Sequence, residues 1–127
     1  LLTVNASGLT AQATGTATFT LDNTGHGTDG TASITGSGGD DSIKVGDFAS
    51  TILGGAGNDT LTGNSKADSL DGGDGKDTLT GGGGDDSLTG GAGDDRFDFA
   101  SNDFTSGDSV TGGAGTDAIR MTDSATV

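Results

Sequence analysis

Eight aspartates could ligate a metal ion, because most of them close a glycine-rich run of the same form, such as GGAGND at 54–59. All 19 acidic residues of the chain are Asp, and Glu is absent. A short carboxylate reaches an ion from a tight turn where Glu would overshoot, and glycine turns also expose backbone carbonyls. Carboxylate and carbonyl oxygens are the ligands of the hard cation Ca²⁺. The eight residues are Asp41, Asp59, Asp68, Asp77, Asp86, Asp95, Asp108 and Asp117.

A row of apolar residues at intervals of nine indicates how these aspartates are positioned. The blocks follow the pattern Gly-Gly-x-Gly-x-Asp-x-apolar-x, in which a tight turn precedes a short strand whose central side chain points inward. Two blocks, or eighteen residues, then form one coil, and stacked coils form two parallel sheets around one apolar line. The row comprises Ile34, Ile43, Ile52, Leu61, Leu70, Leu79, Leu88 and Phe97, and it resumes at Val110 and Ile119 after a thirteen-residue step.

The regular blocks divide the chain into three parts. Residues 36–120 form the predicted roll, with about four residues inserted near 99–102. Residues 1–35 are rich in Thr, Ala and Gly, and their alternating apolar pattern predicts irregular β coils that continue the roll. Residues 121–127 are predicted to be a tail or an edge strand. Within the roll, the block 45–53 keeps only its apolar Ile52, and the block 63–71 replaces its inner glycines with Asn64 and Lys66.

The composition excludes several classes of protein. Only 28% of the residues are apolar and the net charge is −14, so neither an ordinary globular core nor a nucleic-acid-binding surface is expected. Cysteine is absent, which excludes disulfides and thiolate metal sites. No apolar run is long enough for a membrane span and none resembles a signal peptide, so we expect a fragment or a processed product. One apolar residue in nine cannot offset the entropy of ordering each block, so we expect cation-coupled folding.

The blocks GGAGNDTLT, GGDGKDTLT, GGGGDDSLT and GGAGDDRFD closely resemble the calcium-binding nonapeptides of the repeats-in-toxin (RTX) family. The resemblance covers about residues 36–120 and implies an all-β, right-handed parallel β-roll, a β-helical solenoid with calcium between stacked glycine-rich turns. It also implies export by type I secretion and an extracellular or cell-surface location in bacteria. The opening 5–10, NASGLT, resembles linking segments of RTX-containing surface-layer proteins.

The resemblance also implies the ligand sets. An ion lies between turns eighteen residues apart, on the position-two and position-four carbonyls and the aspartate of the earlier turn, and on the position-one and position-three carbonyls and the aspartate of the later turn. On one side the sets are Ser37, Gly39, Asp41 with Gly54, Ala56, Asp59; Gly55, Gly57, Asp59 with Gly72, Asp74, Asp77; Gly73, Gly75, Asp77 with Gly90, Ala92, Asp95; and Gly91, Gly93, Asp95 with Gly112, Ala114, Asp117. On the other side they are Asn64, Lys66, Asp68 with Gly81, Gly83, Asp86; and Gly82, Gly84, Asp86 with Asp103, Thr105, Asp108. Ser50 replaces the aspartate of the preceding turn, so a site between 46–50 and 63–68 is doubtful.

Three other functions have less support in the residues: zinc catalysis, glycoside cleavage and ice binding. Zinc catalysis of the His-Glu-x-x-His kind needs a Glu, and the single His26 is expected in an exposed loop. Paired carboxylates could cleave glycosides, but the repeat already explains every strong pair. Position-five Asp40, Asp85 and Asp94 are expected to tune local charge. An ice-binding threonine face also remains an alternative.

We therefore expect a non-enzymatic, calcium-stabilised module of a secreted bacterial surface-layer, filament or adhesin protein. Unpaired strand edges at the ends of the roll also suggest end-to-end self-association. The alternative is a C-terminal accessory module of a type I-secreted protease, lipase or polysaccharide epimerase.

Overall fold

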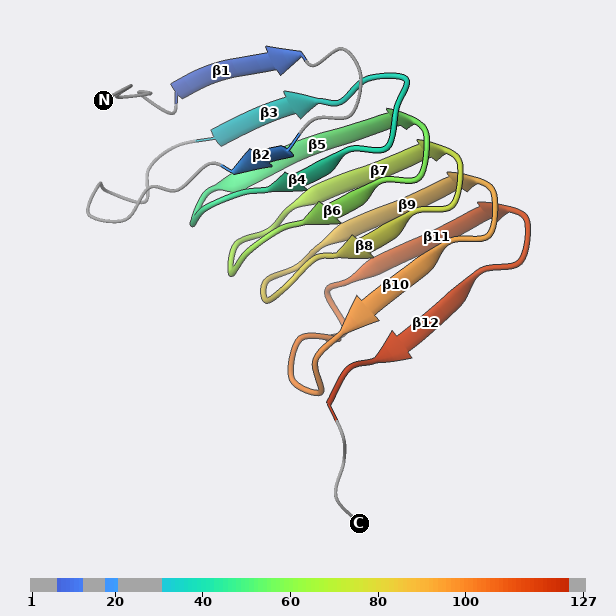
Figure 1. Ribbon diagram of the computed structural model, residues 1–127. Helices are drawn as coiled ribbons and strands as arrows, with labels where there is room; N and C mark the ends of the chain where they lie inside the picture. Colours follow the sequence, from blue (N-terminus) through green and yellow to red (C-terminus); the bar gives the residue numbers. More distant parts are fainter. Residues whose placement is uncertain (1–6, 13–17, 21–30, 124–127) are drawn as a thin grey trace.

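The structure is a flat stack of coils with one parallel sheet on each broad side (Figure 1). This computed structural model describes residues 7–12, 18–20 and 31–123, which form twelve strands and no helix. Since it lacks helices, the described part contains none that could cross a membrane. The strands are β1 (Ser7–Gln12), β2 (Thr18–Thr20), β3 (Thr31–Thr35), β4 (Ser42–Lys44), β5 (Ala49–Ala56), β6 (Thr60–Thr62), β7 (Ser69–Asp74), β8 (Thr78–Thr80), β9 (Ser87–Ala92), β10 (Arg96–Phe99), β11 (Ser109–Ala114) and β12 (Ala118–Met121).

Odd and even strands separate into the two sheets. One sheet has the order β1-β3-β5-β7-β9-β11 and the other has the order β12-β10-β8-β6-β4-β2. Every pair is parallel, because each coil returns to the sheet in the same direction as the coil before it. The predicted all-β parallel roll is therefore confirmed.

The register follows the predicted eighteen-residue coil. Ile52 pairs with Leu70 in one sheet, and Leu61 pairs with Leu79 in the other. The insertion lengthens one coil, so that cross-turn contacts there span 22 residues, but β9 still pairs with β11 and β10 with β12. Phe99 stays in β10 opposite Met121, so the chain leaves the strand only after this residue. The division of the chain at residues 35 and 120 remains a prediction.

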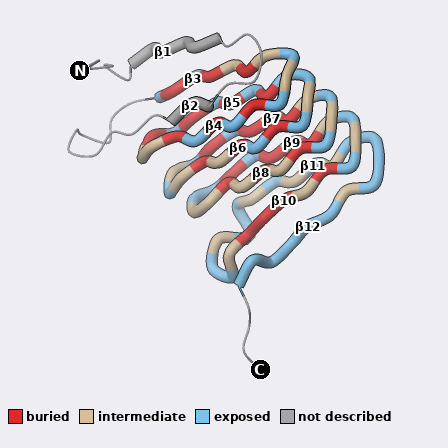
Figure 2. The backbone as a smooth tube through the Cα atoms, viewed as in Figure 1, coloured by how far each residue is buried: buried red, intermediate tan, exposed pale blue. Residues whose placement is uncertain are grey.

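The core is the narrow line between the sheets, which appears in Figure 2 as red segments repeated from coil to coil. The apolar residues from Ile34 to Phe97 in the nine-residue row are all 2% exposed or less. Four further buried apolar residues lie outside that row: Ala32, Val45, Phe48 and Phe99. The repeat pattern did not identify them, because it is blind to apolar residues that occur once.

Glycines at the second and fourth positions of the turns carry the conformation that the turn requires. Ten of them, from Gly55 to Gly115, have φ between 100 and 137°, a region that side-chain-bearing residues rarely adopt. A Cβ at Gly73 would also collide with the carbonyl oxygen of Gly55 in the coil before it. Close stacking of the coils thus depends on glycine for two reasons, backbone conformation and space.

Replacing Gly73 with alanine is expected to lower the free energy of unfolding by about 2–4 kcal/mol, from backbone strain and overpacking together. Gly38→Ala is the matched control, because no heavy atom lies within 4 Å of its added Cβ. The control is expected to change stability by less than about 0.5 kcal/mol. Urea unfolding in saturating calcium measures both, and equal effects of the two variants would contradict this account of the turns.

Candidate metal centre

The position-six aspartates of the turns are withdrawn from solvent. Those from Asp41 to Asp95 are at most 3% exposed, whereas Asp108 and Asp117 of the last coil are half-buried. Each aspartate lies at the end of a turn and directly before a strand. This position holds its carboxylate between stacked coils. A buried carboxylate is costly unless hydrogen bonds or a cation compensate it.

One oxygen of each aspartate is compensated by the backbone. The Asp59 N–H donates to Asp77 Oδ1 at 2.7 Å, and the Asp77 N–H donates to Asp95 Oδ1 at 2.9 Å. The same bond recurs along both sides of the roll, including 2.8 Å from the Asp68 N–H to Asp86 Oδ1. These bonds hold the carboxylates in two rows, with one oxygen engaged toward the preceding coil.

The second oxygen is left without a protein partner in the regular turns. Within the described residues, the buried side-chain atoms that lack any hydrogen bond are Asp59, Asp77, Asp86 and Asp95 Oδ2. Asp59 Oδ2 borders the space that a Cβ on Gly54 would fill, and the Gly72 carbonyl oxygen borders the same space. An unpartnered buried carboxylate oxygen beside a carbonyl oxygen is a pair of ligands that fits a hard cation.

The same arrangement repeats along this side of the roll. Asp77 Oδ2 and the Gly90 carbonyl oxygen both border the space that a Cβ on Gly72 would fill. Asp95 Oδ2 and the Gly112 carbonyl oxygen border the corresponding space at Gly90. Each of these oxygen pairs belongs to one predicted ligand set. At Gly36, the Asp41 Oδ2 and the Gly54 carbonyl also lie together, although this Asp41 oxygen additionally accepts the Ser37 N–H at 2.6 Å.

The predicted carbonyl ligands of the earlier turns also point toward the next coil. A Cβ at Gly73 or Gly75 would collide with the carbonyl of Gly55 or Gly57, and the same holds one coil later. The position-three carbonyls are partly engaged, since Asp74 O accepts the Gly57 N–H at 2.8 Å. A carbonyl oxygen has a second lone pair, so this bond leaves it able to ligate.

The second side of the roll is less regular. Asp68 Oδ2 and the Gly81 carbonyl share the space at Gly63, and the Asn64 and Lys66 carbonyls point at Gly82 and Gly84. The last predicted set is not assembled in the same way. The three atoms nearest to an added Cβ at Gly81 all belong to Asp86, and Asp108 Oδ2 already accepts the Thr105 N–H at 2.6 Å.

Side chains alone do not form a metal site. Among the described residues, no group of three or more His, Cys, Asp or Glu side chains could hold an ion by itself. An ion between two turns therefore draws on backbone carbonyls for much of its coordination shell. Turn geometry thus matters as much as the aspartates do.

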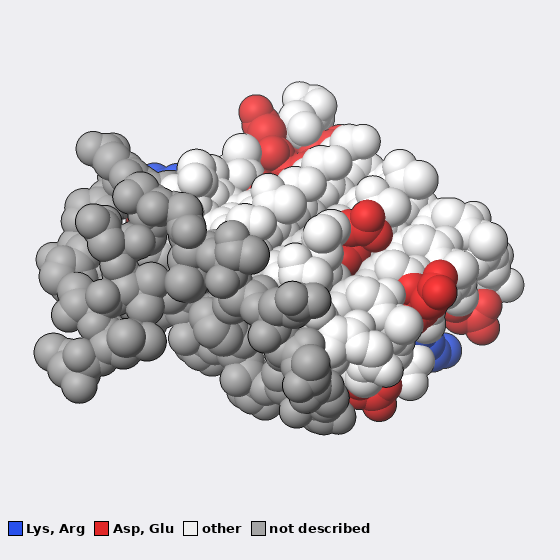
Figure 3. All heavy atoms as spheres, turned by 90° about the horizontal axis from the view of Figure 1, so that it is seen from above, with Lys and Arg blue, Asp and Glu red and all other residues white. Residues whose placement is uncertain are grey.

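The cations of the chain do not neutralise these rows. The chain has five Lys and Arg residues against 19 Asp, and the face in Figure 3 shows carboxylates at several points and little cationic surface. Arg120 donates to Asp98 at 2.6 Å on the outer face of β10, where Arg96 also binds this carboxylate. Burial opposes ionisation of Asp98, yet the two arginines outweigh it and lower its pKa. Neither arginine serves the position-six aspartates in these ion pairs.

Position-five aspartates have a role that the charge argument did not identify. Asp40 Oδ1 accepts the Asn58 N–H at 2.8 Å, and Asp94 Oδ1 accepts the Thr116 N–H at 2.9 Å. These exposed bonds join successive coils outside the metal spaces. An Asp or Asn at position five with a coil following it is the sequence signal for such bonds.

Burial makes the aspartate rows resist ionisation. Loss of solvation, with smaller contributions from neighbouring carboxylates, raises the pKa of Asp77 and of Asp86 from 3.8 to about 6. The pKa of Asp59 and that of Asp95 are also raised, mainly by burial. A bound cation reverses this preference, because it favours the carboxylate.

These shifts predict opposite effects of pH with and without metal. Since the folded pKa is raised above 3.8, protonation stabilises the metal-free roll at low pH, and this contribution is lost as the pH rises through about 6. The calcium affinity of the folded roll should instead rise with pH, by about tenfold per displaced proton between about pH 4 and pH 5 and less steeply as the pH approaches about 6. Calcium titrations at pH values where circular dichroism shows the metal-free roll to be folded test this, and a calcium affinity that is constant across the window would contradict it.

A known family of repeats matches most of the roll. Residues 26–47, 35–70, 45–78, 53–88 and 71–103 match the RTX calcium-binding nonapeptide repeat (4 copies). No curated protein and no solved structure matches the chain. The matched residues together span 26–103, which is more than half of the 127 residues. The chain therefore belongs to the RTX calcium-binding nonapeptide repeat family, and its Asp-rich stacked turns bind calcium ions.

Proposed function

We propose that this calcium-binding β-roll is a module of a secreted bacterial structural protein of the surface-layer, filament or adhesin type, and that it folds on calcium after export. The observation that carries this proposal is the row of buried Oδ2 atoms at Asp59, Asp77 and Asp95, which have no protein partner. They make the folded state depend on an ion that is scarce in the cytosol and abundant outside the cell. RTX repeats are typical of secreted bacterial proteins, and the roll itself is a structural module without a catalytic centre of its own.

The calcium concentration at which the chain folds tests the extracellular role. We expect a midpoint of about 0.1–1 mM, the range of extracellular calcium modules. A chain that is already folded at about 1 μM calcium would fold before export, and the proposal would fail. Magnesium at equal concentration is the control, since it demands near-octahedral geometry and dehydrates reluctantly.

The natural polypeptide that contains these residues distinguishes the structural protein from the alternative. Intact-mass and peptide mapping of the secreted protein would reveal whether a catalytic domain precedes the roll. A protease, lipase or epimerase domain would make the roll an accessory module of a type I-secreted enzyme. Further Thr-, Ala- and Gly-rich β repeats would support the structural role.

End-to-end association of two copies is part of the same proposal. The last described coil exposes Ile119 and Met121 by 52% and 49%, because no other coil among the described residues covers them, and Figure 2 shows β12 exposed where earlier strands are buried. β1 and β2 form the opposite edge of the same two sheets. A second copy could therefore continue both parallel sheets across the junction.

Light scattering over a concentration series in millimolar calcium tests this association. Ile119→Lys is expected to reduce it, and Leu53→Lys is the control, because Leu53 is 42% exposed but lies within the stack. Only monomers at the highest concentration, or equal effects of the two variants, would exclude this junction.

A further inference from the structure

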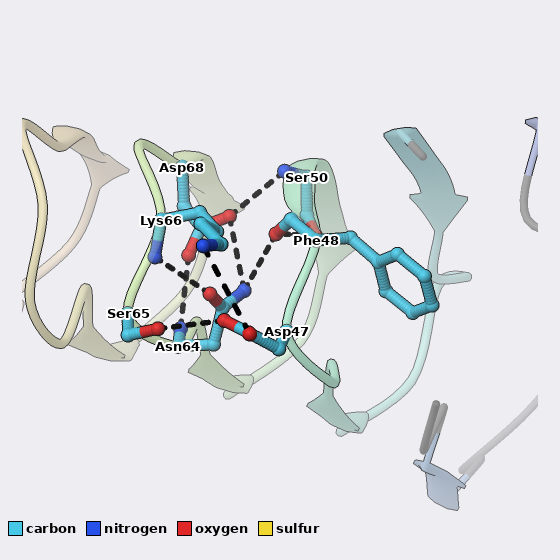
Figure 4. Close-up of polar contacts among 7 residues, drawn as sticks. All are labelled: Asp47, Phe48, Ser50, Asn64, Ser65, Lys66 and Asp68. Carbon is cyan, nitrogen blue, oxygen red and sulfur yellow. Dashed lines mark hydrogen bonds and ion pairs between the residues drawn. The ribbon is translucent and has the colours of Figure 1, made fainter. Parts of the chain in front are cut away.

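The turns 45–50 and 63–68, stacked one coil apart, depart together from the repeat (Figure 4). Position four of the first turn is Phe48 instead of glycine, and position six is Ser50 instead of aspartate. Position two of the second turn is Asn64, whose φ is not positive, whereas the position-two glycines of the regular turns, such as Gly55 and Gly73, have positive φ. The substitutions face one another across the space where the repeat would place an ion.

The Asn64 side-chain amide fills that space with donors. Its Nδ2 donates to the Phe48 carbonyl at 2.6 Å and lies 3.4 Å from Asp68 Oδ1. The Phe48 carbonyl also accepts the Ser50 hydroxyl at 3.1 Å, so both of its lone pairs are used. The Phe48 ring points away from the amide (Figure 4). The carbonyl that would face a cation faces two hydrogen-bond donors instead.

Both oxygens of the Asp68 carboxylate also accept hydrogen bonds, Oδ1 on the side of the preceding coil and Oδ2 beside the Gly81 carbonyl of the following coil. Oδ1 accepts the Ser50 N–H at 2.8 Å, and Oδ2 accepts the Asn64 N–H at 2.9 Å. In the regular turns the position-two residue is a glycine with positive φ, and Asp59 and Asp77 retain an Oδ2 without any bond. A non-glycine residue at position two therefore directs its N–H at the oxygen that a glycine leaves open.

A second layer of contacts holds the Asn64 amide in this orientation. Asn64 Oδ1 accepts the Lys66 N–H at 2.7 Å, which fixes the other end of the amide group. Outside it, the Ser65 hydroxyl donates to Asp47 Oδ1 at 2.6 Å, and Lys66 Nζ lies 3.9 Å from Asp47 Oδ2. An amide donor and a nearby ammonium group both oppose a calcium ion at this place.

We propose that the turns 45–50 and 63–68 form a calcium-free clasp, in which the Asn64 side-chain amide takes the place of an ion. The two coils are joined there by hydrogen bonds that need no metal ion, so this link persists over all calcium concentrations at which the chain is folded. The clasp closes the space on the N-terminal side of Asp68 and limits the second row of metal spaces to the coils that follow.

Asn64→Ala in the 127-residue chain tests the clasp, with Asn58→Ala as the matched control. Asn58 Oδ1 accepts the Lys76 N–H at 2.8 Å, so the control also removes one amide contact between coils. We expect Asn64→Ala to raise the unfolding equilibrium constant about tenfold and the control to raise it less than about threefold. Alanine keeps the backbone carbonyl through which Asn64 belongs to the next ligand set, so native mass spectrometry is expected to count the same number of calcium ions in both variants and in the parent chain.

The calcium dependence of stability separates a clasp from a metal site. The slope of unfolding free energy against the logarithm of calcium concentration reports the ions bound on folding. Asn64→Ala should shift this line without changing its slope. Loss of one bound ion, a lower slope, or stability equal to that of the parent chain would overturn the proposal.

Restoring the repeat provides a second test that does not depend on a destabilised variant. Ser50→Asp combined with Asn64→Gly supplies the missing carboxylate and removes the donor amide. We expect this double variant to bind one calcium ion more than the parent chain. An unchanged ion count in the folded double variant would show that Asn64 is not what excludes the ion, and the proposal would be wrong.

Discussion

Chelation of calcium at neutral pH is expected to convert most of the roll into a disordered chain. The buried Oδ2 atoms of Asp59, Asp77, Asp86 and Asp95 would then be charged and without partners, at the core edge of a chain with a net charge of −14. The core is a line of single aliphatic side chains, whose burial cannot offset both this cost and the entropy of ordering the turns. Far-UV circular dichroism and hydrodynamic radius, in excess chelator and in millimolar calcium, measure the transition.

Hydrogen exchange in the same two solutions is the control for residual structure. Slow exchange that remains in chelator should be weak and should centre on the clasp at 45–50 and 63–68. An identical β spectrum with and without calcium would contradict calcium-coupled folding.

Asp77→Asn is expected to raise the calcium concentration needed for folding by at least about tenfold, as loss of a metal-supporting group typically does. Asp77 is fully buried, its Oδ1 accepts the Asp59 N–H, and its free Oδ2 shares a space with the Gly90 carbonyl. It belongs to the ligand sets on both of its sides, so its substitution weakens two neighbouring ions. The bound-ion count in limiting calcium should fall as well.

Asp71→Asn is the control, because it removes the same charge from a half-buried strand position instead of a turn. Its folding midpoint should stay within about twofold of that of the parent chain. Equal shifts for the two variants would mean that calcium acts by screening net charge and not through the aspartates of the turns.

Periodicity alone was enough to predict the coil. Ile34 through Phe97 are buried where the nine-residue row places them, and glycines such as Gly55 and Gly57 have the positive φ that the turns were expected to need. Repeated contacts leave a repeated signal in the chain, since each coil meets the same neighbours. The burial of Val45 and Phe48 left no such signal, because each contact occurs once.

The sequence could not predict which oxygen of each aspartate accepts a backbone hydrogen bond and which one stays open. Oδ1 of Asp77 is held by a backbone N–H eighteen residues away, whereas Oδ2 is left open, and this depends on where stacked backbones point their donors. Asn64 is a second residue whose contacts could not be predicted from the sequence. The loss of aspartate at Ser50 made a site between these turns doubtful, but only the cross-turn contact of Asn64 Nδ2 with the Phe48 carbonyl reveals a different kind of link.

The sequence by itself therefore determined the repeat length, the line of the core, the turn chemistry and the identity of the ion. These follow from local conformational preference and from the ligand chemistry of Asp and glycine carbonyls. Only the tertiary structure decided which oxygens remain open, as at Asp59, and which are closed by donors, as at Asp68. The reason is physical: an ion or a hydrogen bond between coils depends on the registration of two turns, and each turn alone is compatible with either.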